Sequence, residues 1–418
     1  MTTESRHSFD DIDVRVCTRC GACVSVCPID VIGANGQAVF LQGHCIECGL
    51  CYRLCSGREM DFQALSEAHL GFRPHDPLLG YYRQLEVAQA TSREIREGAA
   101  SGGVVTALLV HLLQTEQIRG VLGVTMDRRK PWKCRAALLT TPEEVRAATQ
   151  SKYSVVTLDA LLRTARRKPG PLALVGLPCH VHGLRRLQRI ASYREKFPLL
   201  IGLFCGFNLE PAATKHLISK AGFDKDQVAQ LQYRGGPWPG GLIIDTHDGE
   251  RHAIAKDAYG YVNLMYAPRR CLTCPDLTNE LADLSVGDTW LEEYAGGWST
   301  VISRSALGAE LLADAAQAGV LGTERIGRDA ILRSHGHLFA YKKEGYFVRQ
   351  RWLRVPLEYT VLRPSIGKAR WLQQSLLLAA ILVLSNPFVR VVVQRLPNSW
   401  LAWLSRWGRT TATKQNRE

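Results

Sequence analysis

The stretch "VCTRCGACVSVCPIDVIG", residues 16–33, decides how the first part of the chain folds. Its cysteines form a C-x2-C-x2-C-x3-C run that ends in Cys27-Pro28. Two-residue gaps let a tight loop aim three thiolates at one centre, while the fourth cysteine serves a second centre. The run therefore predicts a ferredoxin-like α+β module with two 4Fe-4S clusters, which we expect over residues 1–62.

A second run, "CIECGLCYRLC", repeats this spacing over residues 45–55. Because the fourth cysteine of each run crosses to the other cluster, the two runs interlock. One cluster is predicted on Cys17, Cys20, Cys23 and Cys55, and its twin on Cys45, Cys48, Cys51 and Cys27. Zinc is the alternative, since C-x2-C pairs also suit zinc, but zinc ribbons do not need four interlocked cysteines per run. Ser56 departs from the pattern, which has proline after the last cysteine.

Between the two runs, Asn35-Gly36 is a hairpin signal ahead of Val39 and Leu41. We therefore expect a short antiparallel hairpin there.

Length and composition indicate a globular protein of two or three domains. The chain has 418 residues, 46% of them hydrophobic, and its 52 basic against 39 acidic residues give a net charge of +13. The N-terminus lacks the basic-then-apolar order of a signal peptide, so we expect a cytoplasmic location. In a reducing compartment, the 13 cysteines are expected to bind metal rather than pair as disulfides.

A second set of cysteines is scattered along the chain. "PLALVGLPCH" and "FPLLIGLFCG" each indicate a buried strand followed by a cysteine, Cys179 or Cys205. The helix predicted between these strands makes them parallel, and ligands bind at the carboxyl edge of such sheets. "RRCLTCPD" adds Cys271 and Cys274, which completes four thiolates for a third cluster. The alternative, that Cys179 and Cys205 are small buried hydrophobic residues, stays open, and Cys134 is expected to be structural.

The central region contains candidate cofactor contacts. In "EGAASGGVVTALLVHLLQ", residues 97–114, Ser101, Gly102 and Gly103 precede an apolar helix whose first N–H groups could hold a phosphate. This is not the G-x-G-x-x-G fingerprint of dinucleotide-binding folds, and glycines before a helix are often only a turn. Lys152 and Tyr153 offer a cation and a ring for a phosphate and a flat heterocycle, although a solvated lysine beside a core tyrosine is the alternative.

Two further loops are irregular enough for a ligand to approach. "YRGGPWPGG" contains Arg234 and Trp238 among glycines, and "ADLSVGDTW" ends a predicted strand near Gly287 and Asp288. Loops of this kind build sites, but they also occur where nothing binds.

Six motifs in this order resemble the family of the coenzyme F420-reducing hydrogenase β subunit. They cover roughly residues 85–345 and read "SGGVVTALL", "SKY", "GLPCH", "GLFCG", "RGGPWPGG" and "CLTCPDLTNELADLSVGDTW". The family also includes ferredoxin-dependent chlorophyll-pathway reductases, whose first cysteines are arranged less regularly than here. His180 stands where the family has glutamine, and Pro237 is a second departure.

The resemblance implies an FAD-containing oxidoreductase. Its α/β flavin-binding domain would span an N-terminal part, 85–165, and a C-terminal part, 166–345, that carries the third cluster near the flavin. It also implies flavin-phosphate contacts at Ser101, Gly102 and Gly103, with Lys152, Tyr153, Gly287 and Asp288 as weaker candidates. No catalytic residue is assigned; His180, Asp288 and Tyr153 are candidates for the acid that protonates the substrate.

The cofactors suggest an electron relay. Iron-sulfur clusters transfer one electron at a time, whereas a flavin can accept single electrons and deliver a pair of electrons. Electrons would pass between the ferredoxin module, the inner cluster, FAD and a substrate, in either direction. The expected partners are ferredoxin or a redox partner subunit, and a small organic substrate or coenzyme F420. The rival interpretation is an electron-transfer subunit that has no substrate site of its own.

The tail, residues 363–418, holds nine basic residues and one acidic residue and predicts an amphipathic helical segment. Its longest apolar run, Leu376 to Leu384, is shorter than the roughly 20 residues of a spanning helix, and Pro387 and Pro397 break the remainder. Tryptophans beside arginines suggest a segment on the inner face of an anionic membrane, and a helix pair docked on the body or on a partner subunit is the equal alternative. No recognised motif supports a nucleic-acid role.

Overall fold

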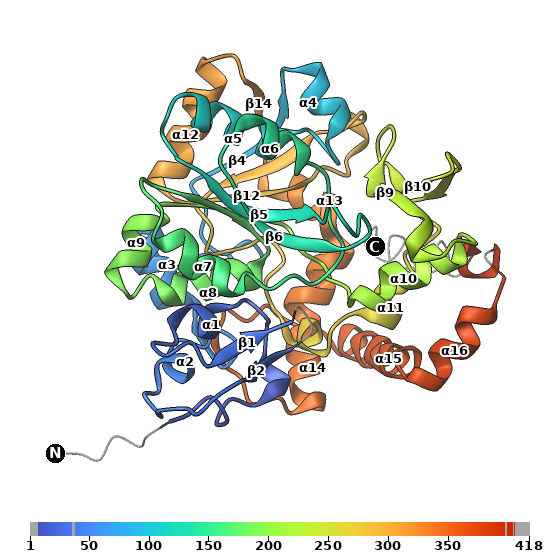
Figure 1. Cartoon of the computed structure of the whole chain (residues 1–418), viewed down its shortest axis with the longest axis horizontal. Helices are drawn as coiled ribbons and strands as arrows, with labels where there is room; N and C mark the ends of the chain where they lie inside the picture. The colour runs from blue at the N-terminus through green and yellow to red at the C-terminus, as the bar shows by residue number, and fades with distance from the viewer. Residues whose placement is uncertain (1–6, 36–37, 398, 404, 406–418) are drawn as a thin grey trace.

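The computed structural model of the protein describes residues 7–35, 38–397, 399–403 and 405. Figure 1 shows the N-terminal module, in blue, below an α/β body, with the last helices in red on the right. The fold is thus a mixed α/β body with a ferredoxin-like module attached to it.

The ferredoxin-like module is built from short elements around the two cysteine loops. Gly21 and Gly49, with φ of +86° and +70°, stand before its two helices in the left-handed region that favours glycine. Each glycine turns the chain between the second and third cysteine of its run. The predicted hairpin is confirmed by antiparallel pairing, although residues 36–37 lie outside the described residues. The elements are η1 (Val14–Val16), α1 (Ala22–Val26), β1 (Ile32–Ala34), β2 (Val39–Leu41) and α2 (Leu50–Arg53).

One eight-stranded mixed sheet forms the body, in the order β14-β4-β13-β12-β8-β7-β5-β6. Neighbours from β12 through β5 run parallel, and the other pairs are antiparallel. The parallel pairing of β7 with β8 confirms the prediction for the strands before Cys179 and Cys205. Strands from 85–165 and from 166–345 share this sheet. They are β4 (Gln84–Ala90), β5 (Val121–Met126), β6 (Cys134–Leu139), β7 (Ala173–Gly176), β8 (Leu199–Leu203), β12 (Leu284–Asp288), β13 (Ser299–Ser303) and β14 (Leu321–Arg325).

Helices cover both faces of the sheet, and each face has its own apolar core. Leu108 and Leu312 are buried in one core, and Leu184 and Leu187 in the other. Because α1 packs against α7 and α8, the ferredoxin module joins the second core. The first face carries α4 (Arg93–Gly98), α5 (Val104–Gln114), α6 (Pro142–Ala147) and α12 (Ala306–Gln317), and the second carries α3 (Phe62–Leu70), α7 (Asp159–Arg166), α8 (Pro178–Leu187) and α9 (Ala191–Lys196).

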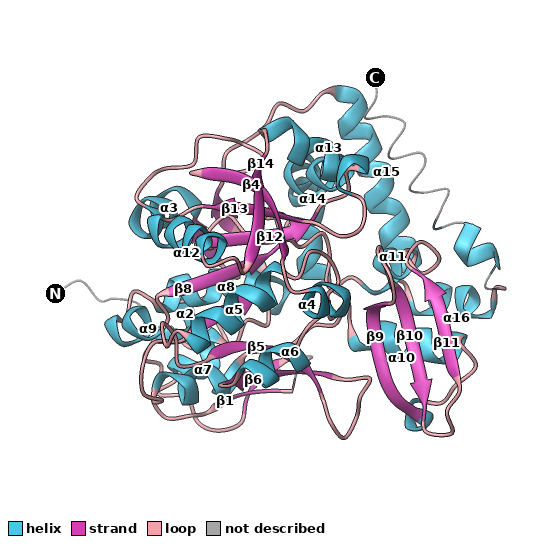
Figure 2. Ribbon diagram, turned by 90° about the horizontal axis from the view of Figure 1, so that it is seen from above, coloured by secondary structure: helices cyan, strands magenta, loops and turns pink. Residues whose placement is uncertain are grey.

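A small antiparallel sheet lies to one side of the large one (Figure 2). The loop "RGGPWPGG" joins its first two strands, so this loop reaches from the small sheet toward the body. Its strands are β9 (Val228–Gly235), β10 (Gly241–Thr246) and β11 (Arg251–Ala255), packed with α10 (Pro211–Lys220), η2 (Lys225–Gln227) and α11 (Val262–Tyr266).

The chain after the sheet returns to the ferredoxin module before it forms the tail. Helix α13 (Arg328–Phe339) continues through a π-helical turn, η5 (Ala340–Glu344), into α14 (Gly345–Leu353). Strand β15 (Glu358–Thr360) then pairs in parallel with β3 (Glu59–Asp61) of the N-terminal region.

The tail forms α15 (Lys368–Leu384) and α16 (Pro387–Arg395), which meet at a bend of 80°. Pro387 begins α16, and α16 ends before Pro397, so both predicted breaks are confirmed. Within the described ranges, no single helix is long and apolar enough to cross a membrane, although the bent α15–α16 pair meets the length and composition criteria together.

Candidate functional site

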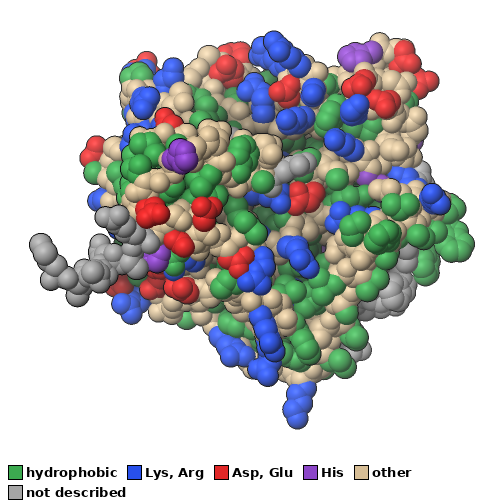
Figure 3. Space-filling model, turned by 60° about the horizontal axis from the view of Figure 1, so that its bottom comes forward, with side chains coloured by type: hydrophobic (Ala, Val, Ile, Leu, Met, Phe, Trp, Pro, Cys, Tyr) green, Lys and Arg blue, Asp and Glu red, His purple; other side chains and the backbone are tan. Residues whose placement is uncertain are grey.

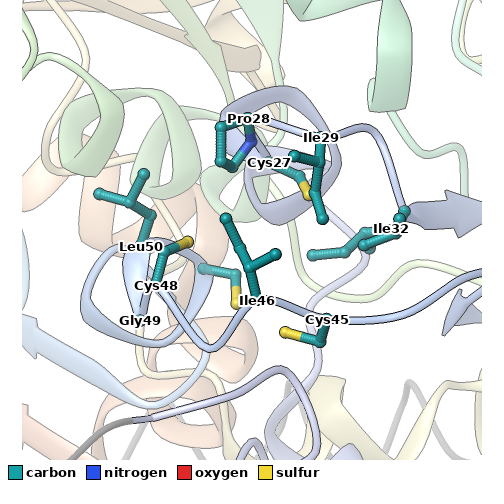
Figure 4. A pocket seen from close by; sticks show the side chains of 11 residues that line it. Cys27, Pro28, Ile29, Ile32, Cys45, Ile46, Cys48, Gly49 and Leu50 are labelled. Carbon is teal, nitrogen blue, oxygen red and sulfur yellow. The ribbon is translucent and has the colours of Figure 1, made fainter.

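The outer cysteine set, Cys27, Cys45, Cys48 and Cys51, surrounds a small pocket in the ferredoxin-like module. Figure 4 shows the sulfurs of Cys27, Cys45 and Cys48 turned toward a common space beside the Ile46 side chain. Burial raises the pKa of the Cys51 thiol to about 11, and Cys45 and Cys48 add to the effect. Thiolates crowded in this way are stabilised by a bound cation, which suits an iron-sulfur cluster.

The inner set, Cys17, Cys20, Cys23 and Cys55, lies together on the side of the module that faces the body. Burial raises the pKa of the Cys23 thiol well above its usual value, and the charges of Cys20, Cys17 and Cys55 add to this. Burial likewise raises the pKa of Cys55 to about 11, with Cys20 and Cys17 contributing. The crossing of Cys27 and Cys55 between the two sets is the interlocked arrangement that the spacing predicts.

The choice between clusters and zinc rests on the spacing of the cysteines along the chain. Across the part of the chain that the structure describes, no group of three or more His, Cys, Asp or Glu side chains is placed to hold a single metal ion. A cubane cluster needs a wider spacing, because each thiolate binds a different iron. The interlocked spacing of the two runs remains the argument for 4Fe-4S clusters over zinc.

Ser56, which replaces the expected proline, has a place in the inner set. It is fully buried, and its Oγ lies 3.7 Å from Cys20 Sγ. Its carbonyl oxygen accepts a hydrogen bond from the Tyr359 hydroxyl, which fixes the turn. A hydroxyl beside a thiolate acts as the donor, and such hydrogen bonds tune a cluster's potential.

The four scattered cysteines come together at the carboxyl edge of β7 and β8. Cys179 lies at the start of α8, Cys205 follows β8, and Cys271 and Cys274 lie in and directly after η3 (Arg269–Thr273). Burial raises the pKa of the Cys179 thiol well above its usual value, and Cys205, Cys271 and Cys274 add to the effect. Three separate segments therefore deliver four mutually close sulfurs, which is the third set that the topology predicts.

Two buried cations accompany this third set. Burial alone would lower the pKa of Lys342, but the combined attraction of Cys274, Cys205 and Cys271 raises it. Arg270 donates through Nε to the Val16 carbonyl at 3.0 Å, directly before Cys17 of the inner set. Sequence reasoning missed both, although Arg270 adjoins a C-x2-C pair. Lys342 carries no local signal, because η5 brings it to the cysteines through the fold alone.

The inner and third sets touch through α8. A Cβ added at Gly183 would lie 2.8 Å from Cys20 Sγ, so the sulfur rests against the helix backbone. Cys179 stands four residues earlier, on the same side of α8. Cys20 also contributes to the raised pKa of Cys179, as expected for neighbouring sulfurs. The ferredoxin-like module therefore presents its inner set directly to the third set.

A cavity of about 1640 Å³ adjoins the third set, because Cys205 lines it. Its volume exceeds the roughly 300–1,000 Å³ of an ordinary ligand pocket, so it has room for two molecules side by side. Of the seven predicted cofactor contacts, those that line the cavity are Ser101, Gly103, Lys152, Tyr153, Gly287 and Asp288.

Gly102 is the predicted contact that faces away from the cavity. Its N–H donates to Ser299 Oγ at 3.1 Å, and a Cβ there would lie 2.5 Å from the Ala88 carbonyl oxygen. Gly102 thus lets the chain pack against the sheet. Gly103, with φ of +74°, begins α5, whose first-turn residues Val104, Val105 and Thr106 line the cavity. The first turn of α5 therefore borders the cavity.

A polar group that includes Tyr153 and Asp288 lies on the cavity wall. Arg234 is 1% exposed and donates to Asp288 Oδ2 at 2.7 Å and to the Tyr153 hydroxyl at 3.4 Å. Lys256 Nζ donates to the same hydroxyl at 2.9 Å. Burial alone would raise the pKa of Tyr153, but Lys256 and Arg234 lower it. The loop "RGGPWPGG" contributes through Arg234, whose role the sequence did not reveal.

Lys152 and His180 are both engaged with the backbone. Lys152 Nζ donates to carbonyls of the preceding turn, among them Thr149 at 2.6 Å and Gln150 at 3.0 Å, and burial lowers its pKa to about 8. His180 Nε2 lies 2.9 Å from the Val156 carbonyl oxygen, and its Nδ1 accepts from the Leu177 N–H at 3.4 Å. Both ring nitrogens of His180 are therefore engaged with the backbone.

His335 is a cavity residue that sequence reasoning missed. It is 3% exposed, and its Nδ1 has no hydrogen-bond partner among the described residues. Burial lowers its pKa to about 4, so the ring is neutral near pH 7. A buried polar atom without a partner that borders a cavity is suited to bind a ligand.

The chain matches three family descriptions. Residues 86–163 match the coenzyme F420 hydrogenase/dehydrogenase beta subunit N-terminus, residues 170–329 match its C-terminus, and residues 10–56 match a 4Fe-4S dicluster domain. The coenzyme F420 hydrogenase subunit beta of Methanothermobacter thermautotrophicus is 30% identical over 60% of this chain and 86% of its own length.

Two further relatives extend this comparison. The coenzyme F420 hydrogenase subunit beta of Methanococcus voltae is 30% identical over 67% of this chain and 99% of its own length. The coenzyme F420-dependent sulfite reductase of Methanocaldococcus jannaschii is 28% identical over 72% of this chain but only 46% of its own length.

A solved chain from the F420-reducing [NiFe] hydrogenase complex of Methanosarcina barkeri shares the fold. It superimposes with a TM-score of 0.54 and 24% identity, over 69% of this chain and 98% of its own. Since both family descriptions match in order and the Methanothermobacter relative is covered over most of its length, the chain belongs to the coenzyme F420 hydrogenase/dehydrogenase beta subunit family and contains a 4Fe-4S dicluster domain at residues 10–56.

Proposed function

We propose that this chain is an iron-sulfur flavoprotein oxidoreductase that passes electrons between a redox partner and an organic substrate. The observation that carries the proposal is the unbroken order of sites. The outer and inner cysteine sets share one module, Cys20 of the inner set rests on α8, and Cys205 of the third set lines the large cavity. The three cysteine sets would carry one electron at a time toward the cavity, where a two-electron cofactor would bind.

The residues present fit three 4Fe-4S clusters. Each predicted set contains four cysteines, and burial raises the pKa of thiols in every set, so a cationic cluster would relieve the repulsion among the thiolates. Lys342 and Arg270 add positive charge beside the third set, which favours the more negative, reduced state of a cluster held there.

The cavity fits FAD together with a substrate. FAD, when bound, would exchange single electrons for pairs. The start of α5, at Ser101 and Gly103, offers backbone N–H groups and the positive end of the helix dipole to its phosphates. Tyr153 and Asp288, held by Arg234, are polar contacts for the ring system. Lys152 would reach a phosphate only by giving up carbonyl partners.

The substrate class follows from the relatives and from the room in the cavity. Relatives named as beta subunits of coenzyme F420 hydrogenase and as an F420-dependent sulfite reductase make coenzyme F420 the first candidate. A small conjugated ring or alkene is the second. His335, which lines the cavity, is a positioning contact for either, because its Nδ1 has no hydrogen-bond partner by geometry among the described residues.

An electron-transfer subunit without its own substrate is the competing function. Two candidates for the acid that protonates a substrate already have partners in the protein, and this favours a subunit without a substrate. His180 is hydrogen-bonded to the backbone, and Asp288 is paired with Arg234. Partner subunits would then complete the chemistry, and the related hydrogenase chain comes from a complex.

Flavin analysis separates the two functions. The chain is purified without oxygen, reconstituted with FAD and denatured, and the released flavin is quantified. The oxidoreductase proposal expects about one FAD per chain and a loss of binding when Gly103→Val displaces the helix start, because φ there is +74° and an added Cβ would press on Ile95. Gly322→Ala, at an open strand position, is expected to keep the flavin. Chains with intact clusters that retain no flavin would establish the electron-transfer subunit instead.

A further inference from the structure

The C-terminal helices α15 and α16 each present exposed apolar side chains in a row. Leu372, Leu376 and Val383 on α15 are 61%, 62% and 59% exposed, and Phe388 and Val392 on α16 are 85% and 63% exposed. Along each helix these positions recur at the spacing of one face. Soluble monomers rarely expose large contiguous apolar patches without a partner for them.

Both helices are nevertheless firmly attached to the body. Leu378 and Ile381 are buried in a cluster with Leu272 and Tyr341. Below α16, Lys220 Nζ donates to the Leu396 carbonyl at 2.7 Å, and Gln394 donates to the Tyr266 hydroxyl at 2.9 Å. The body therefore holds the helices by their inner sides, and the outer apolar row serves no visible packing purpose.

The charged residues of the chain segment that forms this row have one sign. From residue 359 to residue 405 the chain has five Lys and Arg and not one Asp or Glu. Lys368 and Arg395, at opposite ends of the helix pair, are exposed. Figure 3 shows hydrophobic side chains gathered on the right and lower part of this face, with Lys and Arg beside them.

Exposed tryptophans lie near both ends of the apolar row. Trp352 is 62% exposed and donates from Nε1 to Ser375 Oγ on α15 at 3.2 Å. Trp400, after α16, is 65% exposed. Tryptophan is enriched at the boundary between the acyl chains and the headgroups of a membrane, where its ring is apolar and its N–H is polar.

We propose that this α15–α16 face binds the surface of an anionic phospholipid bilayer. The face consists of Trp352, Leu372, Leu376, Val383, Phe388, Val392 and Trp400, with Lys368 and Arg395 at its ends. An apolar row bordered by basic residues and tryptophans matches a segment lying in the membrane interface. A protein interface would carry a polar rim, whereas every charged residue of the described tail, residues 359–405, is basic, and one of them, Arg370, pairs with Glu344 of the body.

Membrane binding through this face goes beyond the redox function and does not depend on it. It also places the cavity close to the bilayer, because the same helices line the cavity from the inside with Leu377, Leu384 and Val393. The outer side of each helix would contact lipid while the inner side closes the cavity.

Vesicle flotation of the complete, cluster-loaded protein tests the proposal. Vesicles of phosphatidylcholine with phosphatidylglycerol are compared with vesicles of phosphatidylcholine alone, at low and high salt. We expect binding to the anionic vesicles that weakens with salt, because surface attraction falls off within a Debye length of about 10 Å at 0.1 M. Phe388→Glu combined with Val392→Glu is expected to weaken the binding at least about tenfold.

The matched control is Leu307→Glu, at an exposed apolar position on α12. It is expected to bind like the wild type, while iron content and circular dichroism verify that each variant is folded. Equal vesicle binding by the wild type and the α16 variant would overturn the proposal. A wild-type dimer in sedimentation velocity that Phe388→Glu dissociates, without vesicle binding, would also overturn it and identify a protein interface.

Discussion

Replacing Gly183 by alanine probes the contact on which the electron path depends. The added Cβ would lie 2.8 Å from Cys20 Sγ and 2.9 Å from Cys20 Cβ, where ordinary contacts begin at 3.4 Å. The helix and the cysteine loop must therefore separate by roughly 0.6 Å. With a cluster bound, Cys20 cannot rotate away, because its sulfur is held by iron.

The expected sign is destabilisation. Glycine to alanine inside a helix usually stabilises by about 0.5–1 kcal/mol, whereas overpacking a tight contact costs about 1–3 kcal/mol. We therefore expect Gly183→Ala to lose about 0.5–2 kcal/mol of unfolding free energy and to transfer electrons more slowly from the ferredoxin-like module to the body.

The matched control is Gly123→Ala, at a position on β5 where an added Cβ meets nothing within 4 Å. Anaerobic denaturant unfolding gives the change in stability, and rapid-mixing reduction followed by absorbance gives the electron-transfer rate. If Gly183→Ala were as stable and as fast as the control, Cys20 would not rest on α8, and the proposed order of sites would fail.

Three further predictions rest on single contacts. Ser56→Ala should lower the midpoint potential of the inner cluster in an EPR-monitored titration, because the lost hydrogen bond to Cys20 stabilised the reduced state; an unchanged potential would refute this. Arg234→Gln should cost about 3 kcal/mol in denaturant unfolding because it leaves Asp288 without its cation, and adding Asp288→Asn should recover part of the loss; full additivity of the two changes would contradict the pairing. Burial lowers the pKa of Lys152 to about 8 from an ordinary 10.5, so between pH 8 and pH 10.5 the unfolded chain binds more protons than the folded chain. The unfolding free energy of the wild type should therefore rise with pH in this range relative to that of Lys152→Met. A difference in unfolding free energy that does not change with pH would argue against the shift.

Cysteine spacing and strand order predicted the cysteine sets and the parallel strands correctly. The interlocked runs predicted which cysteines gather in the ferredoxin-like module, and the parallel pairing of β7 and β8 follows from a buried strand, a helix and a second buried strand. These patterns are local or depend on one crossover connection. For this reason the sequence alone places Cys179 and Cys205 at one edge of the sheet.

The features that sequence reasoning missed depend on distant contacts. Lys342 reaches the third cysteine set only because α13 continues through the π-helical turn η5, and no periodicity marks that turn. Ser56 looked like a defect in a motif, and its role appears only beside Cys20. Strand β4 lies between β13 and β14, an order that chain sequence does not reveal. The exposed apolar row on α15 and α16 could be identified only from the contacts on the inner side of these helices. Composition alone does not distinguish a docked helix face from an exposed one.

The central claim is that four cysteines from three distant segments hold a third cluster between the ferredoxin-like module and the cavity. It is tested most directly by iron and sulfide analysis with Mössbauer spectroscopy on the anaerobic wild type and on Cys179→Ser, with Cys134→Ser, a buried cysteine outside the three sets, as the control. The account predicts about twelve irons per chain in the wild type and in Cys134→Ser, and about eight in Cys179→Ser, all in 4Fe-4S clusters. About eight irons in the wild type, or no loss of iron in Cys179→Ser, would contradict it.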